Sequence, residues 1–211
     1  MTQELGLRER KKLQTRRRLW SVAIDLFSER GFDQVSVAEI AAAADVSKMT
    51  VFNYVATKED LALGPMEEHI GDPARVVRER AAGESAVAAL RRHFIEALGA
   101  HDASVGLNDD QHVVRVRQLI QDTPALLIRA HSFGARSADL LAAELAAETG
   151  DPVIAQVAAA QLLGARNALI TENHRRLLTG ETPDAMYEDA VARAEAAFDL
   201  VENGLRGYAV R

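Results

Sequence analysis

The chain has 211 residues and a mass of 22.9 kDa, enough for one large domain or for a small domain joined to a larger one. Hydrophobic residues make up 48% of it and charged residues 27%, which is typical of a globular protein. Because the sequence contains no cysteine, disulfides, zinc–thiolate sites, iron–sulfur clusters and thiol nucleophiles are excluded. No run reaches the roughly 18 apolar residues of a membrane span and the N-terminus is charged, so we expect a soluble, cytoplasmic protein with no membrane partner.

The net charge of −6 is distributed unevenly along the chain. Residues 1–18 contain seven basic side chains and two acidic ones, a local balance of +5. From residue 61 onward there are 15 arginines and no lysine against 22 acidic residues, a balance of −7. A basic end on an acidic body favours polyanion binding by the N-terminal part. Charge alone leaves open the alternative of a solvated basic tail.

The first helices are predicted from apolar spacing and from capping residues. Apolar side chains between Leu19 and Phe27 recur every three or four positions, and Gly31 follows as a helix terminator. Ser36 with Glu39 three residues later forms a capping-box pattern. The predicted helices cover residues 8–30, 37–44 and 48–55, the last capped by Ser47, and a longer helix follows the cap Thr57.

Later helices are longer and are separated by Gly and Pro signals. The sequence Gly71-Asp72-Pro73 interrupts the fourth helix, and the stretch from 101 to 109 has the composition of a loop. Further helices are predicted over about 84–100, 110–121, 124–150, 152–178 and 183–207. Since no alternating β-branched run is present, we predict an all-α fold of about nine helices.

Residues 36–61 have the pattern of a helix-turn-helix. Two short amphipathic helices are joined by Ala44-Asp45-Val46, and a small core is supplied by Ile40, Ala41 and Val51. A helix placed in the DNA major groove must present polar groups from its first turns to base edges. The predicted DNA contacts are Lys48, Met49, Thr50, Asn53 and Tyr54 on the second helix, Ser36 before the first, and Lys58 at the start of the next.

At these positions the chain resembles the DNA-binding domain of TetR-type transcriptional repressors. The segment AIDLFSERGF (residues 23–32) and the following helix-turn-helix match the family pattern over residues 12–61. Three positions depart from it, with Asp45 for the usual glycine, Phe52 for the usual tyrosine, and Val55 where many members have phenylalanine. Because phenylalanine cannot donate the hydrogen bond that the tyrosine often makes to a phosphate, we assign that role to Tyr54 and Lys58. Phe52 is then a packing residue or a contact with sugar or a thymine methyl group.

The resemblance implies two domains, a basic-armed DNA-binding domain over residues 1–61 and a helical effector-binding and dimerisation domain over 62–211. It also implies a ligand-responsive regulator, which represses from a palindromic double-stranded DNA operator and is released by a small hydrophobic or amphipathic effector. No cofactor, metal or catalytic residue is implied. Residues 114–127, VRVRQLIQDTPALL, resemble the C-terminal domains of actinobacterial TetR-type regulators, some of which are similar to acyl-coenzyme A sensors.

A homodimer is expected because one recognition helix reads only a few base pairs. Small and apolar residues at helical spacing in the last two helices predict the dimer interface, and a purely intramolecular core is the alternative. The interface is predicted at Gly164, Ala165, Ala168, Ala194, Phe198, Val201 and Leu205. The effector pocket is predicted at Met66, His93, Phe94, Val113, Arg117, His131, Phe133, Arg166 and Asn167, each of which could instead belong to the plain core.

Two other classes of protein fit the sequence less well. An enzyme is disfavoured because the six histidines show no metal-binding spacing and no phosphate-binding glycine loop or nucleophile elbow is present. A helical adaptor for protein partners would need a non-polar surface on the second short helix. That helix instead carries side chains able to form hydrogen bonds, and steep salt dependence of duplex-DNA retention would distinguish the two.

Overall fold

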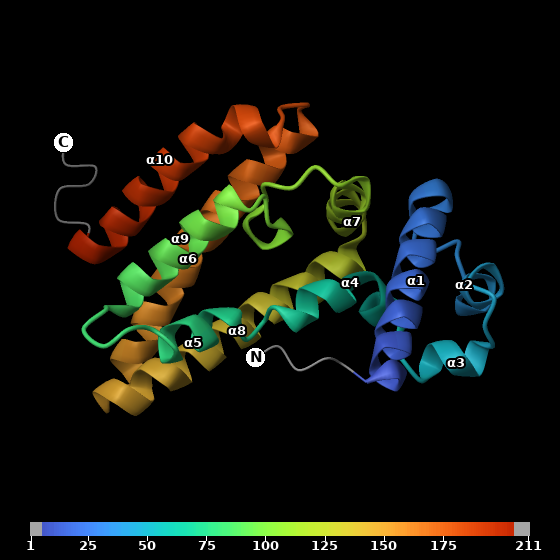
Figure 1. The fold of residues 1–211 in the computed structure, drawn as a ribbon, viewed down its shortest axis with the longest axis horizontal. Helices are drawn as coiled ribbons and strands as arrows, with labels where there is room; N and C mark the ends of the chain where they lie inside the picture. Colours follow the sequence, from blue (N-terminus) through green and yellow to red (C-terminus); the bar gives the residue numbers. More distant parts are fainter. Residues whose placement is uncertain (1–5, 205–211) are drawn as a thin grey trace. The chain divides into compact units, whose positions relative to one another are not determined.

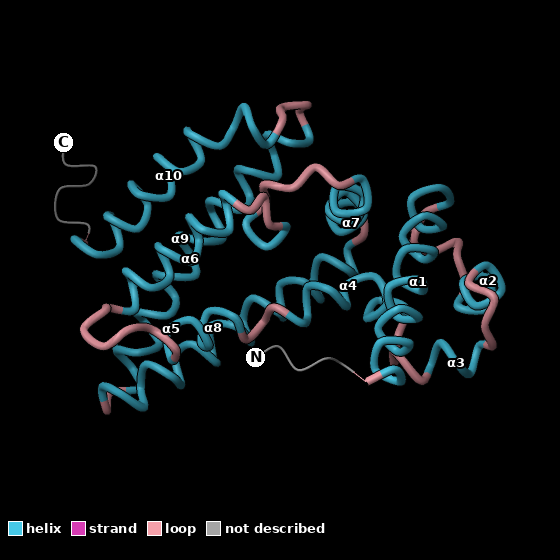
Figure 2. Tube along the Cα trace, viewed as in Figure 1, coloured by secondary structure: helices cyan, strands magenta, loops and turns pink. Residues whose placement is uncertain are grey.

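A computed structural model describes residues 6–204, and every regular element within that range is a helix. Figures 1 and 2 show long helices joined by short loops. The helices are α1 (Leu7–Arg30), α2 (Val37–Ala43), α3 (Lys48–Phe52), α4 (Lys58–Glu68), α5 (Asp72–Arg78), α6 (Ala86–Gly99), η1 (Ala103–Val105), α7 (Gln111–Asp122), α8 (Pro124–Thr149), α9 (Pro152–Leu178) and α10 (Pro183–Asn203). The all-α prediction is confirmed, and the interruption near Pro73 separates α4 from α5.

The predicted caps explain where the helices begin. The Ser36 and Glu39 side chains form the reciprocal capping box, and the Ser47 hydroxyl accepts from the Thr50 N–H. Thr57 and Asp60 exchange backbone-to-side-chain hydrogen bonds in the same way at the start of α4. The capping residues named from the sequence therefore mark the first residues of these helices.

The third helix is shorter than predicted. It ends at Phe52, whereas the sequence indicated a helix to Val55. The reason is a tightened last turn, in which the Asn53 and Tyr54 N–H groups donate to carbonyls three residues back. Asn53 is therefore the residue that closes α3.

The described residues divide into two compact units. The N-terminal unit comprises the residues up to Pro65 together with Arg115–Ala130, and the C-terminal unit comprises Met66–Val114 and the residues from His131 onward. The boundary predicted at residue 61 lies close to Pro65. No local signal indicated that a segment of α7 and α8 would group with the N-terminal residues, because that grouping depends on contacts between distant parts of the chain.

In the N-terminal unit, α1 carries the core-facing residues that position the two short helices. Leu19, Ile24 and Phe27 are buried, and the Phe27 and Phe32 rings lie 4.9 Å apart between centroids. Ile40 of α2 and Val51 of α3 are both fully buried. This small apolar core holds α2 and α3 together beside α1 (Figure 1).

In the C-terminal unit, α6, α9 and α10 pack together around one large core (Figure 2). Its largest members include Phe94 and Phe198, whose rings meet edge-on with centroids 6.0 Å apart. On the surface of the same unit, Arg91 of α6 reaches Asp199 and Glu202 of α10. Apolar packing and charged contacts thus join the same two helices.

Candidate nucleic-acid interface

The third helix, α3, is fixed at its start and on its inner side. The Ser47 hydroxyl accepts from the Thr50 N–H at 3.0 Å and hydrogen-bonds the Thr50 hydroxyl at 2.8 Å. Val51 is fully buried and anchors the helix to the core of the N-terminal unit. The remaining side chains of this short helix are directed away from that core.

The turn between α2 and α3 brings the two helices close together. Ala41 and Ala44 are buried and have no bulk beyond a methyl group, so the backbones can approach. Asp45 adopts a φ of 54°, a left-handed conformation that aspartate tolerates better than most residues. This explains why aspartate can stand where the resembling family has glycine.

The outward side of α3 combines charged, apolar and amide groups. Lys48 and Asn53 are exposed, and Met49 and Phe52 are 71% and 45% exposed. The Lys48 ammonium lies 5.9 Å from the centroid of the Phe52 ring. Tyr54 is half-buried just beyond the helix. Such a mixture can donate to phosphates and bases and can also contact thymine methyl groups.

Two of the predicted contact residues have local partners already. Thr50 is half-buried and its hydroxyl shares a hydrogen bond with Ser47. The Ser36 hydroxyl donates to Glu39 Oε2 at 2.7 Å, so its single proton is engaged in the cap. Ser36 therefore positions α2.

Glu39 is the acidic half of that cap. Hydrogen bonds from the Ser36 backbone and hydroxyl, together with the Arg30 guanidinium 2.7 Å away, lower the pKa of Glu39 to about 2. At neutral pH the carboxylate is thus ionised and engaged. It secures the start of α2.

Lys58 is used differently from its prediction as a phosphate contact. Its ammonium donates to the carbonyl oxygens of Phe32 at 2.7 Å and Val35 at 3.2 Å. The same nitrogen lies 4.2 Å from the centroid of the Phe32 ring. The side chain is turned into the N-terminal unit, where it ties α4 to the loop before α2. The sequence could not indicate this, because the two carbonyls lie 26 and 23 residues away.

The first turns of α1 carry a row of exposed cations. In the part of the chain that the structure describes, none of them forms an ion pair with a carboxylate within 4 Å. Arg16 is set apart from this row, since it is half-buried and has a partner. The exposed cations are Arg8, Arg10, Lys11, Lys12, Arg17 and Arg18.

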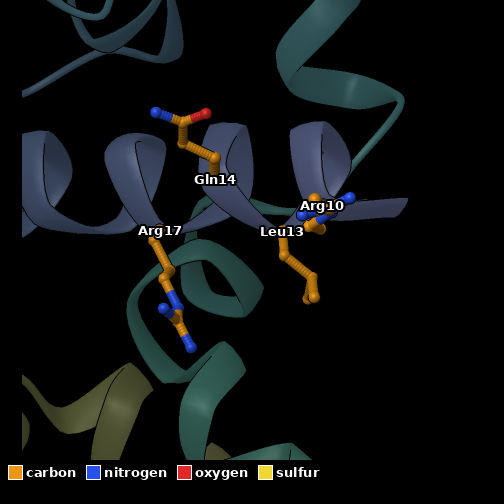
Figure 3. Close-up of a pocket in the computed structure, with 4 residues that line it drawn as sticks. All are labelled: Arg10, Leu13, Gln14 and Arg17. Carbon is orange, nitrogen blue, oxygen red and sulfur yellow. The ribbon is translucent and has the colours of Figure 1, made fainter. Parts of the chain in front are cut away.

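A shallow surface hollow lies along the same helix. It is lined by Arg10, Leu13, Gln14 and Arg17, which are spaced at one helical face or next to it. In Figure 3, Leu13 and Arg17 project to the same side of α1. A surface with two guanidinium groups, an amide and an apolar side chain suits a sugar–phosphate backbone.

Comparison with known proteins agrees with this geometry. Residues 19–64 match the family model described as bacterial regulatory proteins, tetR family. The HTH-type transcriptional regulator TcmR of Streptomyces glaucescens is 32% identical over 152 residues, which cover 69% of this chain and 67% of TcmR. The chain belongs to the TetR family of transcriptional regulators.

Solved TetR-family structures share the fold. NalD of Pseudomonas aeruginosa, the secondary repressor of the MexAB-OprM multidrug efflux pump, aligns over 89% of this chain and 96% of its own with a TM-score of 0.59 and 19% identity. FadR of Thermus thermophilus, a TetR-family repressor in complex with lauroyl-CoA, aligns over 93% and 96% with a TM-score of 0.54 and 24% identity. At these identities the likeness establishes the fold.

The residues predicted to line an effector pocket are distributed over several helices. Phe94 is buried, and its ring meets that of Phe198 in the core of the C-terminal unit, which agrees with the alternative of a plain core residue. Phe133 is also buried, whereas His131 and Asn167 are exposed. The half-buried positions are Met66, His93, Val113 and Arg166 in the C-terminal unit and Arg117 in the N-terminal unit.

Two of the predicted dimer residues of α10 lie on the inward side of that helix. Ala194 and Phe198 are fully buried within the same chain, so they cannot contact a second copy. Of the other predicted positions, Gly164 and Ala168 of α9 are exposed, Ala165 and Val201 are half-buried, and Leu205 lies outside the described residues.

One exposed row of residues on α10 was not predicted from the sequence. Ala192, Ala196 and Leu200 form the exposed row of α10, with Leu200 38% exposed. Their small size is the one local signal that points to them, and the more apolar row containing Phe198 outweighed it. Phe52 was left between packing and DNA contact, and its exposure places it on the outward side of α3.

Proposed function

We propose that this TetR-family regulator is a homodimeric repressor that reads a palindromic operator through α3 and is released by a small effector. The observation that carries the proposal is the coexistence, within the described N-terminal unit, of an anchored α3 with outward Lys48, Met49 and Asn53 and a row of exposed α1 cations without carboxylate partners. Outward α3 side chains supply base recognition, and α1 cations supply phosphate attraction.

The base contacts are assigned by chemistry. The Asn53 amide can donate and accept on an adenine edge, and Thr50 adds a hydroxyl. Met49 and Phe52 offer apolar surface to thymine methyl groups. Lys48 and Tyr54 are suited to phosphates. Lys58 is left out of this set because its ammonium is bound to carbonyls inside the unit.

Dimerisation is proposed through α9 and α10. On α9, exposed residues four or seven positions apart include Val153, Val157, Gly164 and Ala168. On α10, the exposed row contains Ala192, Ala196 and Leu200. Small and apolar outward residues on two adjacent helices suit a four-helix interface between two copies. Two α3 helices about one turn of DNA apart, ~34 Å, then define a palindrome.

The apolar character of α9 has a second interpretation. By length and composition alone the helix could cross a membrane, but such helices also occur in soluble proteins. Its buried face belongs to the core of the C-terminal unit, with Leu162, Leu163 and Ile170 packed there. A dimer surface on the outer face accounts for the remaining apolar residues without a bilayer.

Release by an effector requires that the ligand bind one arrangement of the two DNA-binding units better than the other. The FadR structure that shares this fold holds lauroyl-CoA, an amphipathic molecule. We therefore expect an amphipathic or hydrophobic ligand, and we propose that it binds the C-terminal unit.

The test is selection of bound sequences from random duplexes by the full chain, followed by affinity measurement on the selected site. We expect an enriched palindrome, and we expect Asn53→Ala to weaken binding by about 1–3 kcal/mol for each base contact that it removes. Gln111→Ala is the control, because Gln111 is an exposed amide at the start of α7, outside the proposed DNA, dimer and effector surfaces, and should leave the affinity unchanged. Failure to enrich any sequence, or equal affinities for Asn53→Ala and the parent, would refute the proposal.

A further inference from the structure

Arg166 occupies an unusual place on α9. It lies on the side of the helix that faces the apolar core, between Leu162 and Leu163 in one turn and Leu169 and Ile170 in the next, all of them buried. The arginine itself is half-buried. Placing a guanidinium among buried apolar side chains is costly unless a carboxylate compensates its charge.

Among the described residues, no carboxylate compensates the charge of Arg166. The hydrogen bond of its guanidinium is to a neutral acceptor, from Nη2 to the Ser104 carbonyl oxygen at 3.1 Å, and within the described range no carboxylate lies within 4 Å. Other arginines of the same helix are paired, with Arg175 bound to Glu172 and Arg176 bound to Glu181. Burial lowers the pKa of Arg166, against the opposing attraction of Asp72 and Asp102.

The two acidic residues that attract Arg166 are already engaged elsewhere. Asp72 accepts from His69 at 2.7 Å and from Arg75 at 3.0 Å, one partner on each carboxylate oxygen. Asp102 caps η1 by accepting from the Ser104 N–H at 2.7 Å. Both carboxylates thus make their hydrogen bonds to other residues, and neither lies within ion-pair distance of Arg166.

His93 of α6 lies in the same electrostatic neighbourhood. It is half-buried, and its pKa is lowered because burial disfavours the imidazolium and because Arg166 repels it. The ring is therefore neutral at pH 7 and offers one N–H donor. Arg166, His93 and the loop at η1 thus bring together donors that lack an acidic partner within the described chain.

We propose that Arg166, assisted by His93, binds the carboxylate of an organic monoanion, and that this is the charged end of the effector. That this ligand is the effector rests on the proposed function. The anion site itself is argued from the contacts and surroundings of Arg166. A guanidinium pairs with a carboxylate through two parallel hydrogen bonds. The nearby Asp72 and Asp102 disfavour a phosphate dianion, and the apolar residues beside Arg166 favour a ligand with an apolar body.

The first test needs no ligand and measures the melting temperature of the full chain. Arg166→Met keeps the length of the side chain and removes a charge that the described residues leave uncompensated, so we expect the melting temperature to rise. Arg176→Met is the matched control on the same helix, and it should lower the melting temperature because the ion pairs of Arg176 with Glu181 and Asp189 are lost. A fall of equal size in both variants would assign Arg166 a purely structural role and overturn the proposal.

The second test uses defined probes, decanoate and benzoate with decanamide and benzamide as uncharged counterparts, and inorganic phosphate. We expect at least one carboxylate to raise the melting temperature of the parent chain above the value with its amide, saturating at one molecule per chain. The shift should vanish in Arg166→Met, persist in part in Arg166→Lys and remain in Arg175→Met. Equal shifts by acids and amides, a shift that survives Arg166→Met, a response to phosphate alone, or no response to either carboxylate would overturn the proposal.

Both tests are made without DNA and are therefore independent of operator binding. Retention of the Arg166→Met variant on the selected duplex is measured separately and should equal that of the parent without ligand. If the carboxylate shift is present and no chain binds duplex DNA, the proposed function fails while the anion site stands.

Discussion

The N-terminal helix α1 and the C-terminal unit use the same kind of side chain in opposite ways. The exposed cations Arg8 to Arg18 on α1, Arg16 apart, have no carboxylate within ion-pair distance in the described chain. In the C-terminal unit every described arginine except Arg166 is paired with an acidic residue. These are Arg75, Arg78, Arg80, Arg91, Arg92, Arg136, Arg175, Arg176 and Arg193.

Pairing, more than the number of basic residues, decides what a cation does. A paired arginine joins helices or stabilises a surface turn, and its charge is cancelled at short range. A cation without a carboxylate partner keeps its attraction for a polyanion. We therefore expect phosphate binding by α1 and little DNA attraction by the more numerous arginines of the C-terminal unit.

The largest effect is expected from removing the exposed α1 cations. A variant in which Lys11, Lys12, Arg17 and Arg18 are all changed to Gln should lower duplex affinity by orders of magnitude at low salt. The slope of log affinity against log salt should fall by about 0.9 for every phosphate that is no longer bound. The control changes Arg78, Arg136, Arg175 and Arg193 to Gln, and titrations at several salt concentrations should show the slope of the parent. Equal salt slopes for the two quadruple variants would show that pairing with a carboxylate does not determine which basic residues bind DNA.

A stability effect is expected at Lys58, which the sequence placed among the phosphate-binding cations. Because its ammonium binds two carbonyls inside the N-terminal unit, Lys58→Met should lower the free energy of unfolding by about 2 kcal/mol. Denaturant unfolding measures this change. If the variant unfolds like the parent but binds DNA more weakly, this prediction is wrong and Lys58 contacts phosphate.

A smaller effect is expected at Met49, the most exposed apolar residue of α3. Replacing contacted thymines of the selected operator by deoxyuridine removes single methyl groups, each worth about 0.8 kcal/mol when buried. The parent should bind the substituted duplex several-fold more weakly, and Met49→Ala should bind both duplexes alike. If the parent is insensitive to the methyl groups, Met49 does not read them.

The smallest effect concerns Glu39, a paired carboxylate of the N-terminal unit. Its pKa in the folded chain is about 2, below the usual 4.5, so the stabilisation it gives is present above pH 4.5 and is lost as the pH falls toward 2. Glu39→Gln should remove this part of the acid sensitivity in unfolding experiments between pH 5 and roughly 2. Parallel pH profiles for the variant and the parent would contradict the capping role.

Much of the fold was predictable because the signals are local. Ser36, Ser47 and Thr57 cap the helices that they were expected to cap, and each accepts from a backbone N–H three residues away. The helix-turn-helix was recognisable for the same reason, since its core residues lie within one short segment. Structural features that depend on residues within about four positions of one another could thus be predicted from the sequence.

Features set by distant packing were not predictable. Both rows of α10 are rich in alanine, and only contact with α6 and α9 decides that the row of Ala194 and Phe198 is buried and that of Ala192 and Ala196 is exposed. The inward turn of Lys58 depends on the carbonyls of Phe32 and Val35 in another part of the chain. The lack of an ion pair at Arg166 was likewise not predictable, because it depends on the hydrogen bonds that Asp72 and Asp102 form with other residues.

Crosslinking can establish whether α3 meets the duplex. Phe52 is replaced by the photoreactive analogue p-benzoylphenylalanine, and Leu140 of α8, which has similar exposure, receives the same group in a control variant. Irradiation of the complexes with the selected duplex should attach DNA to position 52 and leave position 140 free. A complex that forms but yields no crosslink at position 52, or that yields one at position 140, would show that α3 is not the helix that reads DNA.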